Sequence, residues 1–286
     1  MSEGRATAAA AGAPIHVSVV SHGHGPLVRD LLHDLGRQTG VDLHVTVTLN
    51  VAEPVSFERA KGSVPLSVVE NAFPRGFGAN HNAAFARDGA ADGYFCVANP
   101  DVRLEPAVLA RLVETLGAHP SAAVVAPRVR DQAGRVQNSA RRLPTPGRLL
   151  RRVARSRSRL DYPLGTGWRQ ADWVAGMFMV FPSRLFAELG GFDERYFLYY
   201  EDVDLCCRAH LAGYDVLLDE SACVTHDGLW DSHRNPRYLR WHLASMARFF
   251  RSGVYREAGR RARAREERAA WRAGALARAP SEREGP

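Results

Sequence analysis

The stretch "YFCVANPDVRLEP", residues 94–106, begins as an apolar strand and turns polar within three residues. Pro100 fixes the backbone and prevents the strand from continuing. Ligands of parallel sheets bind at the carboxyl ends of the strands, which is where Asn99 and Asp101 are expected. An aspartate there can hold a hard divalent cation together with the phosphate oxygens of a nucleotide. The alternative is an Asx-type turn that caps the following helix, and the "NPD" sequence taken alone favours that alternative.

The chain around this stretch alternates between two hydrophobic periods. Short β-branched runs predict strands at 15–21, 43–50, 65–71, 94–99, 122–129, 172–182 and within 215–228. Helical spacing of apolar residues predicts helices at 27–38, 80–90, 106–119, 183–191, 201–214 and 236–250. This alternation predicts an α/β fold with a mostly parallel central sheet covered on both faces. The turn-rich, basic segment 130–150 is expected to be a long surface excursion.

The 286 residues suffice for one large α/β domain. We expect a flexible leader at 1–14, the domain at 15–230, and an amphipathic helix with a basic Ala/Arg-rich tail at 231–286. No apolar run approaches the ~20 residues that span a bilayer, and the start lacks the apolar block of a secretory signal. The four cysteines lack zinc-site spacing, which favours a reducing cytoplasm.

The net charge of +7 comes almost entirely from arginine, because Lys61 is the only lysine. The arginines gather at 141–159 and in the tail, a pattern that suits an anionic membrane surface or a phosphorylated ligand as well as DNA. Segment 141–159 has no aromatic residues to stack on bases, so we expect no nucleic-acid partner. The helix near Trp241 mixes aromatics with arginines as interfacial helices do, although packing on the domain explains it equally well.

Three further stretches carry candidate chemistry. In "GGFDERYFLYYEDVDLCCRAHLAGY", residues 190–214, Glu201 and Asp202 open a helix, where they can act as capping acids. The aromatic surroundings could instead desolvate them and raise a carboxylate pKa towards that of a useful base. His226 in "VTHDG" can contact a metal or phosphate, but a single histidine is more often structural. The Gly76–Gly78 pair is a poor match to a dinucleotide-binding loop and reads equally as an ordinary loop.

In this order the motifs resemble those of a bacterial family 2 glycosyltransferase with the GT-A fold, of the rhamnosyltransferase type. The resemblance covers roughly residues 15–250 and rests on "SVVSHGHG", "NAFPRGFGANHNAAF", "VANPDVRL", "SARRLPTP", "DWVAGMFMVFPSRLFAELGGFDERYFLYYEDVDLCCR" and "THDG". It implies that Asp101 holds Mg²⁺ or Mn²⁺ against the diphosphate, with Asn99 in the place of the family's first acid. His226 then reaches the metal or the diphosphate. Asp202 becomes the general base, with Glu201 orienting the acceptor or serving as the alternative base.

The resemblance also implies a set of substrate contacts. Ser21 and Asn82 fall where family members bind the nucleotide, and Trp173 and Gly176 where the donor sugar and acceptor are framed. The family's nucleobase-binding aspartate is missing from "VTLNVAEP", so Asn50 or Glu53 must replace it.

The implied reaction is metal-dependent, inverting transfer of L-rhamnose from dTDP-L-rhamnose to a saccharide hydroxyl. The acceptor would be a polyprenyl-linked intermediate of surface polysaccharide at the inner face of the cytoplasmic membrane. A catalytically inactive sugar- or nucleotide-binding protein on the same fold is the alternative, although such a binder has no need of a base. A nucleotidyltransferase would want a Gly/Lys-rich phosphate loop that "SHGHGPLVRD" does not supply.

Overall fold

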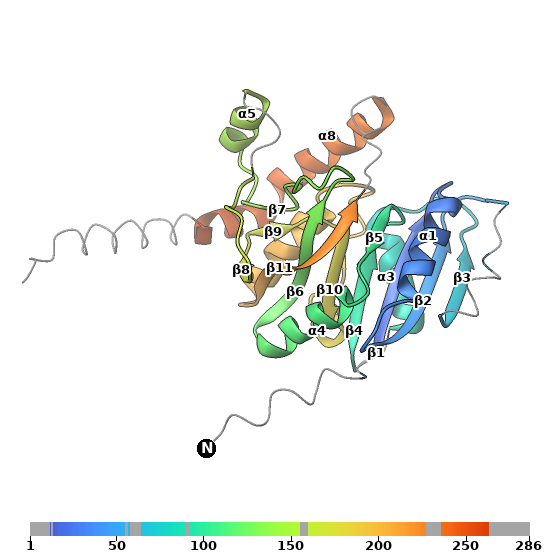
Figure 1. The fold of residues 1–286 in the computed structure, drawn as a ribbon. Coiled ribbons are helices and arrows are strands. Elements are labelled where there is room, and N and C mark those ends of the chain that lie inside the picture. Colours follow the sequence, from blue (N-terminus) through green and yellow to red (C-terminus); the bar gives the residue numbers. More distant parts are fainter. Residues whose placement is uncertain are drawn as a thin grey trace, which may run out of the picture.

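A nine-stranded sheet forms the centre of the computed structural model, with the strand order β3-β2-β1-β4-β10-β6-β11-β5 and β8 paired to β11 (Figure 1). The structure describes residues 14–54, 64–89, 92–154, 160–226 and 236–262, together with Gly12 and Phe57. The expected α/β fold class is confirmed. Most of the expected leader and the tail beyond residue 262 lie outside the described residues, so the domain boundaries stay predictions.

The main strands lie close to where their apolar runs predict them. They are β1 (Pro14–Ser21), β2 (Asp42–Leu49), β3 (Leu66–Glu70), β4 (Tyr94–Ala98), β6 (Ala122–Arg130), β10 (Phe178–Pro182) and β11 (Asp215–His226). Strands β1 to β4 pair in parallel, and β11 is parallel to β6. Strand β10 runs antiparallel between β4 and β6. Three short strands were not expected separately: β5 (Val102–Leu104), β8 (Trp168–Gln170) and β9 (Trp173–Val174).

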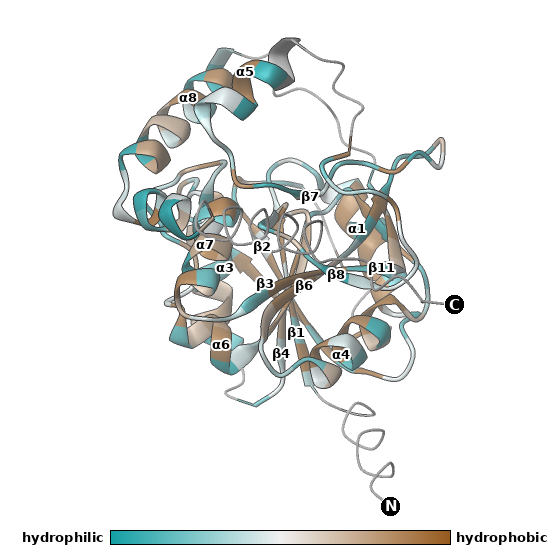
Figure 2. Ribbon diagram, turned by 90° about the vertical axis from the view of Figure 1, so that its left-hand side faces the viewer, coloured by the Kyte–Doolittle hydropathy of each residue, from teal (hydrophilic) through white to brown (hydrophobic). Residues whose placement is uncertain are grey.

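Helices cover both faces of the sheet (Figure 2). On one face lie α1 (Gly25–Leu35), which packs against β1 and β5, and α4 (Val108–Ala118), which packs against β6 and β11. Both helices bury leucines and valines in this contact. On the other lie α3 (Phe77–Asp88), α6 (Ser183–Glu188) and α7 (Glu201–Leu211), packed in an aromatic core. The C-terminal α8 (Pro236–Arg251) joins that second core through the fully buried Phe249. No helix in the described ranges is long and apolar enough to cross a membrane.

The segment 130–150, expected as a long surface excursion, contains secondary structure that the sequence analysis did not predict. This segment contains β7 (Ala140–Arg141), which pairs with β9, and the start of α5 (Pro146–Ala154). Thr145 accepts a hydrogen bond at its Oγ1 from the Arg148 N–H, 3.2 Å away, and Pro146 occupies the first turn. A threonine cap followed by proline is an ordinary start signal for a helix. The arginine-rich composition obscured it.

A buried polar row lies between the sheet and α3, where only apolar strand residues were expected. His16 Nε2 lies 2.9 Å from Thr46 Oγ1, which donates to Asp88 at 2.7 Å. Ser18 Oγ lies 2.8 Å from His81 Nδ1, while the buried His81 Nε2 has no partner. Desolvation lowers the pKa of His16 to about 4 and that of His81 to about 3. Both imidazoles are therefore neutral at physiological pH.

This row predicts acid sensitivity of the fold. Below about pH 6.5 the unfolded chain takes up protons that folded His16 and His81 refuse, so stability present above that pH is lost as pH falls. At about pH 5 each histidine should cost about 2 kcal/mol of unfolding free energy. We expect His81→Asn to lose less stability than wild type between about pH 7.5 and pH 5 in urea titrations.

The matched control is His33→Asn on the exposed face of α1, where the side chain is 68% accessible. This control should follow the wild-type pH dependence. Equal losses in all three proteins would show that the buried histidines do not set the acid sensitivity.

Candidate active site

The end of β4 forms the first half of the site. The Val102 N–H bonds the Asn99 carbonyl at 3.4 Å and closes the turn that carries Asp101. Strand β5 then pairs with the end of β11, with Val102 opposite His226. This register brings Asp101 Oδ2 to 3.2 Å from His226 Nε2. The helix-cap interpretation of Asp101 is wrong, because a strand follows it and α4 begins only at Val108.

Gln137 fixes the orientation of the histidine. Its Nε2 donates to the His226 carbonyl at 3.0 Å, and its Oε1 lies 3.3 Å from His226 Nδ1. A donor role for Nδ1 would leave the lone pair of Nε2 free to bind a cation.

Asp101 Oδ1 is buried and has no hydrogen-bond partner. A carboxylate with one unsatisfied oxygen, beside an imidazole, fits a Mg²⁺ or Mn²⁺ ion that takes its remaining ligands from diphosphate and water. No group of three or more His, Cys, Asp or Glu side chains suited to a metal occurs in the described part of the chain.

The first turn of α7 forms the second half of the site. Asp202 Oδ2 accepts the Gly176 N–H at 3.0 Å, and Oδ1 accepts the Val203 N–H at 2.8 Å. The two residues that precede the helix, Tyr199 and Tyr200, have φ angles of 70° and 69°. This left-handed region costs a non-glycine residue roughly 1 kcal/mol or more. Strain of this kind persists only where the surrounding structure enforces it.

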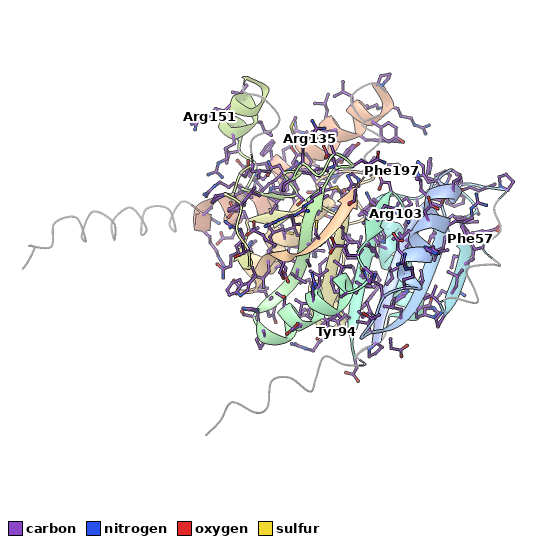
Figure 3. The ribbon with its side chains drawn as sticks, in the orientation of Figure 1. Phe57, Tyr94, Arg103, Arg135, Arg151 and Phe197 are labelled. Atoms are coloured by element: carbon purple, nitrogen blue, oxygen red, sulfur yellow. The ribbon has the colours of Figure 1, made fainter. Side chains whose placement is uncertain are left out.

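Helix α8 supplies that enforcement. The Tyr200 ring packs against Phe249 with centroids 5.5 Å apart, and Ser245 Oγ donates to the Leu198 carbonyl at 2.8 Å. Phe197 lies under α8 against Trp241, with ring centroids 4.7 Å apart (Figure 3). The inner face of this amphipathic helix thus packs on the domain, which was one of the two interpretations of its sequence.

Two adjacent residues join the halves. The Gly176 N–H bonds the Asp202 carboxylate, and the Met177 carbonyl accepts the Asn99 N–H at 2.8 Å. Asp101 follows Asn99 by two residues. The structure therefore brings Asn99, Asp101 and His226 to the same edge of the sheet as Gly176, Glu201 and Asp202.

The two acids of α7 differ in their surroundings. Glu201 is buried, and its Oε2 has no partner. Burial first, and then the charge of Asp202, raise the pKa of Glu201 well above its ordinary value. Burial also raises the pKa of Asp202, but the Gly176 and Val203 N–H groups and the charge of Arg141 oppose that rise. We infer that Glu201 holds the proton of this pair and that Asp202 is the ionised member.

Arg141 was not among the expected site residues, although it lies in the "SARRLPTP" motif. Its guanidinium lies 5.1 Å from the ring centroid of Trp173, and the Trp173 Nε1 donates to the Arg142 carbonyl at 3.0 Å. Pairing of β7 with β9 places Arg141 opposite Trp173. Trp173 is thus held beside a cation that also acts on Asp202. Its expected role in framing the substrate stays a prediction.

The residues expected to contact the nucleotide mainly hydrogen-bond to the backbone of loops. Ser21 ends β1, and its Oγ accepts the His24 N–H at 3.2 Å. The Asn50 amide donates to the Arg75 carbonyl at 2.9 Å and accepts the Arg75 N–H at 2.8 Å. The Glu53 carboxylate accepts the Gly23 and Gly25 N–H groups at 2.9 and 3.0 Å, at the start of α1. These bonds fix the loops at the ends of β1 and β2, and the nucleotide contacts themselves stay predictions.

Asn82 lies on α3 and braces a different loop. Its side chain accepts the Phe192 N–H at 2.9 Å and donates to the Phe192 carbonyl at 2.8 Å. It therefore holds the "GGFDE" turn that leads towards α7. No signal in the sequence linked these two segments, and the expected nucleotide contact of Asn82 stays a prediction.

Comparison with known structures identifies the class of this fold. The mannosyltransferase PcManGT from Pyrobaculum calidifontis, solved with GDP-Man and Mn²⁺, superposes with a TM-score of 0.58 at 18% identity, covering 84% of this chain and 64% of that one. The fold is that of the GT-A glycosyltransferases.

The sequence relatives are more specific, although no protein-family model matches the chain. The chain is 33% identical over 163 residues to the N-acetylglucosaminyl-diphospho-decaprenol L-rhamnosyltransferase of Mycobacterium tuberculosis, covering 54% of this chain and 52% of that relative. It thus spans about half the length of that protein. It is also 26% identical over 249 residues to the rhamnosyltransferase WbbL of Escherichia coli K12, covering 82% of this chain and 92% of WbbL. The chain resembles family 2 glycosyltransferases of the rhamnosyltransferase type.

The protonated state of Glu201 can be tested by stability. A carboxyl whose folded pKa is raised loses stability as pH rises from its unfolded pKa through its folded one. Glu201→Gln keeps a neutral side chain of similar shape, so it should stabilise the fold relative to wild type at about pH 8 and have little effect at about pH 4. Chemical unfolding at both pH values measures the difference.

Glu114→Gln on the exposed face of α4 is the matched control and should change stability equally little at both pH values. A Glu201→Gln variant that is less stable than wild type at about pH 8 would mean that the folded protein uses the ionised Glu201 carboxylate.

Proposed function

We propose that the protein is an inverting glycosyltransferase that moves a sugar from a nucleoside diphosphate to a saccharide hydroxyl. One observation carries this proposal: Asn99 and Asp202 bond to the adjacent residues Met177 and Gly176, so the Asp101–His226 pair and the Asp202 carboxylate lie at the same edge of the sheet. A cation site and a proton acceptor at one edge are the two functions that the reaction needs.

Asp202 acts as the general base. Its carboxylate, held by two backbone N–H groups, accepts the proton of the acceptor hydroxyl as that oxygen attacks the anomeric carbon. The new C–O bond forms on the face opposite the nucleotide, and the bond from the anomeric carbon to the diphosphate breaks. Asp101 and His226 would hold the divalent cation, which neutralises charge on the departing diphosphate.

The donor we propose is dTDP-L-rhamnose, and the acceptor a polyprenyl-linked saccharide. Support comes from the names of two relatives: one is an N-acetylglucosaminyl-diphospho-decaprenol L-rhamnosyltransferase, and the other is the rhamnosyltransferase WbbL. Such an acceptor would place the protein in the cytoplasm, peripheral to the inner face of the membrane, with contact through its C-terminal region. The proposed product is an intermediate of cell-surface polysaccharide.

Replacing the base should remove transfer while sparing binding. Asp202→Asn keeps the shape of the side chain and loses the proton acceptor, so the transfer rate should fall about 10²–10⁴-fold. In wild type the rate should fall as pH drops through the raised pKa of Asp202, because only the ionised form accepts the proton. Rates across a pH series, with dTDP-rhamnose and a soluble acceptor, measure both effects.

Nucleotide affinity of Asp202→Asn is the control and should match wild type. Undiminished transfer by this variant would remove Asp202 from the role of base and leave Glu201 as the candidate.

The cation site can be tested without turnover. A thermal-shift screen of dTDP, UDP and GDP with and without Mn²⁺ should give its largest shift with dTDP and Mn²⁺. Ligand at a hundredfold excess over Kd stabilises by about 2.7 kcal/mol, or several degrees for a chain of this size. Asp101→Ala should abolish the part of the shift that depends on Mn²⁺.

Asp30→Ala on α1, where the carboxylate is 64% accessible, is the control and should keep the full shift. If no nucleotide diphosphate stabilised the protein in either condition, the transferase proposal would have to be abandoned. Nucleotide binding without transfer by any tested donor would favour the inactive binding protein.

A further inference from the structure

Two helices that are distant in sequence stand at the same end of the molecule. α5 and α8 both lie beyond the carboxyl ends of β6 and β11 (Figures 1 and 2). This is the edge that carries Asp101 and His226. A surface formed by the two helices would therefore adjoin the proposed site of transfer.

Both helices expose leucines that the core does not use. Leu150 on α5 is 72% accessible, and Leu239 and Leu243 on α8 are 51% and 49% accessible. Leu239 and Leu243 are four residues apart and share one side of α8. The inward side of α8 is occupied by the buried Ser245 and Phe249. Packing on the domain thus explains only one face of this helix.

The same helices carry charge of one sign. α5 contains three arginines and α8 contains four, and neither contains an aspartate or glutamate. Arg151 extends from α5 away from the body of the molecule (Figure 3), and Arg240 is exposed on α8. Exposed leucines among arginines match the acyl boundary and phosphate groups of an anionic bilayer. A second copy of the chain would bring the same positive charge against itself, which disfavours self-association through this surface.

We propose that α5 and α8 together form a docking surface for anionic phospholipid membranes. Leu150, Leu239 and Leu243 enter the interfacial region, and the neighbouring arginines contact lipid phosphates. This inference rests on the proposed function in one respect. The proposed function explains why the protein would bind a membrane, since a polyprenyl-linked acceptor would lie in the bilayer beside the site. It also extends the expected membrane contact from the C-terminal region to α5.

The test is co-sedimentation of the full chain with vesicles. Wild type should bind vesicles of phosphatidylcholine with about 30% phosphatidylglycerol, bind pure phosphatidylcholine weakly, and lose affinity as salt rises. Each arginine at the surface contributes roughly fivefold to the partition coefficient, so Arg151→Glu/Arg240→Glu should lower it about 25-fold or more. Leu150→Ser/Leu243→Ser should also weaken binding, with the salt dependence retained.

The control carries the same change in net charge at the opposite edge of the sheet. Arg37→Glu/Arg184→Glu alters the end of α1 and the start of α6, where both side chains are exposed. This variant should bind vesicles nearly as wild type does. Thermal melts should show that all three double variants are folded.

Equal binding by both charge-reversal variants would overturn the proposal, as would binding that ignores lipid charge. Sedimentation velocity without lipid tests self-association. If wild type were a dimer that Leu150→Ser/Leu243→Ser dissociates, and if wild type did not bind vesicles, the surface would be assigned to a second copy of the chain. Vesicle binding is measured without nucleotide, and transfer with a soluble acceptor. The membrane-docking proposal and the transferase proposal can therefore fail independently of each other.

Discussion

The hydrogen bond from the Gly176 N–H to the Asp202 carboxylate is the constraint on which the site depends. It fixes the proposed proton acceptor to the chain that enters β10, and the next residue, Met177, bonds to the chain that leaves β4. Gly176 lies close to both the Phe77 ring and Asp202: a Cβ on it would make ordinary van der Waals contact with them, at 3.4 Å and 3.6 Å. An antiparallel β10 between β4 and β6 is what brings these groups together, since its first residues lie at the carboxyl ends of its neighbours.

A second constraint holds the carboxylate in the required orientation. Two successive tyrosines in the left-handed region turn the chain into α7. Such a turn is unfavourable for side chains of this size, and the contacts of Tyr200 with α8 offset its cost. The aromatic run "YFLYY" therefore serves the geometry of the turn as well as the desolvation of the acids. Burial then separates the two acids, with Glu201 favoured in the protonated form and Asp202 kept available by N–H donors and a nearby arginine.

Most of the elements could be predicted from the sequence, since Pro100 ends β4 and Gly190–Gly191 follow the end of α6 as expected. Asp101 and the acids Glu201 and Asp202 could be assigned to element ends for the same reason. Strand direction could not be predicted, because a period of two is the same in parallel and antiparallel strands. Gln137 and Arg141 also escaped prediction. Arg141 reaches the site through the pairing of β7 with β9, and Gln137 through its side-chain contacts with His226 at the end of β11. Contacts between residues so far apart in the chain leave no local pattern. No glycine marks the strained turn at Tyr199, and the polar row under β1 is hidden among apolar neighbours.

Helix α8 links the proposed base, Asp202, to the proposed membrane surface, and its two faces have different roles in these proposals. The inner face holds the strained turn through Ser245 and Phe249, and the outer face presents Leu239, Leu243 and Arg240. A change confined to the outer face leaves the inner contacts in place, so the orientation of Asp202 should not depend on it. A change at Phe249 would instead release the turn and the carboxylate with it. The proposed membrane attachment and the proposed proton transfer should therefore be separable by mutation within a single helix, even though both are assigned to the same edge of the sheet.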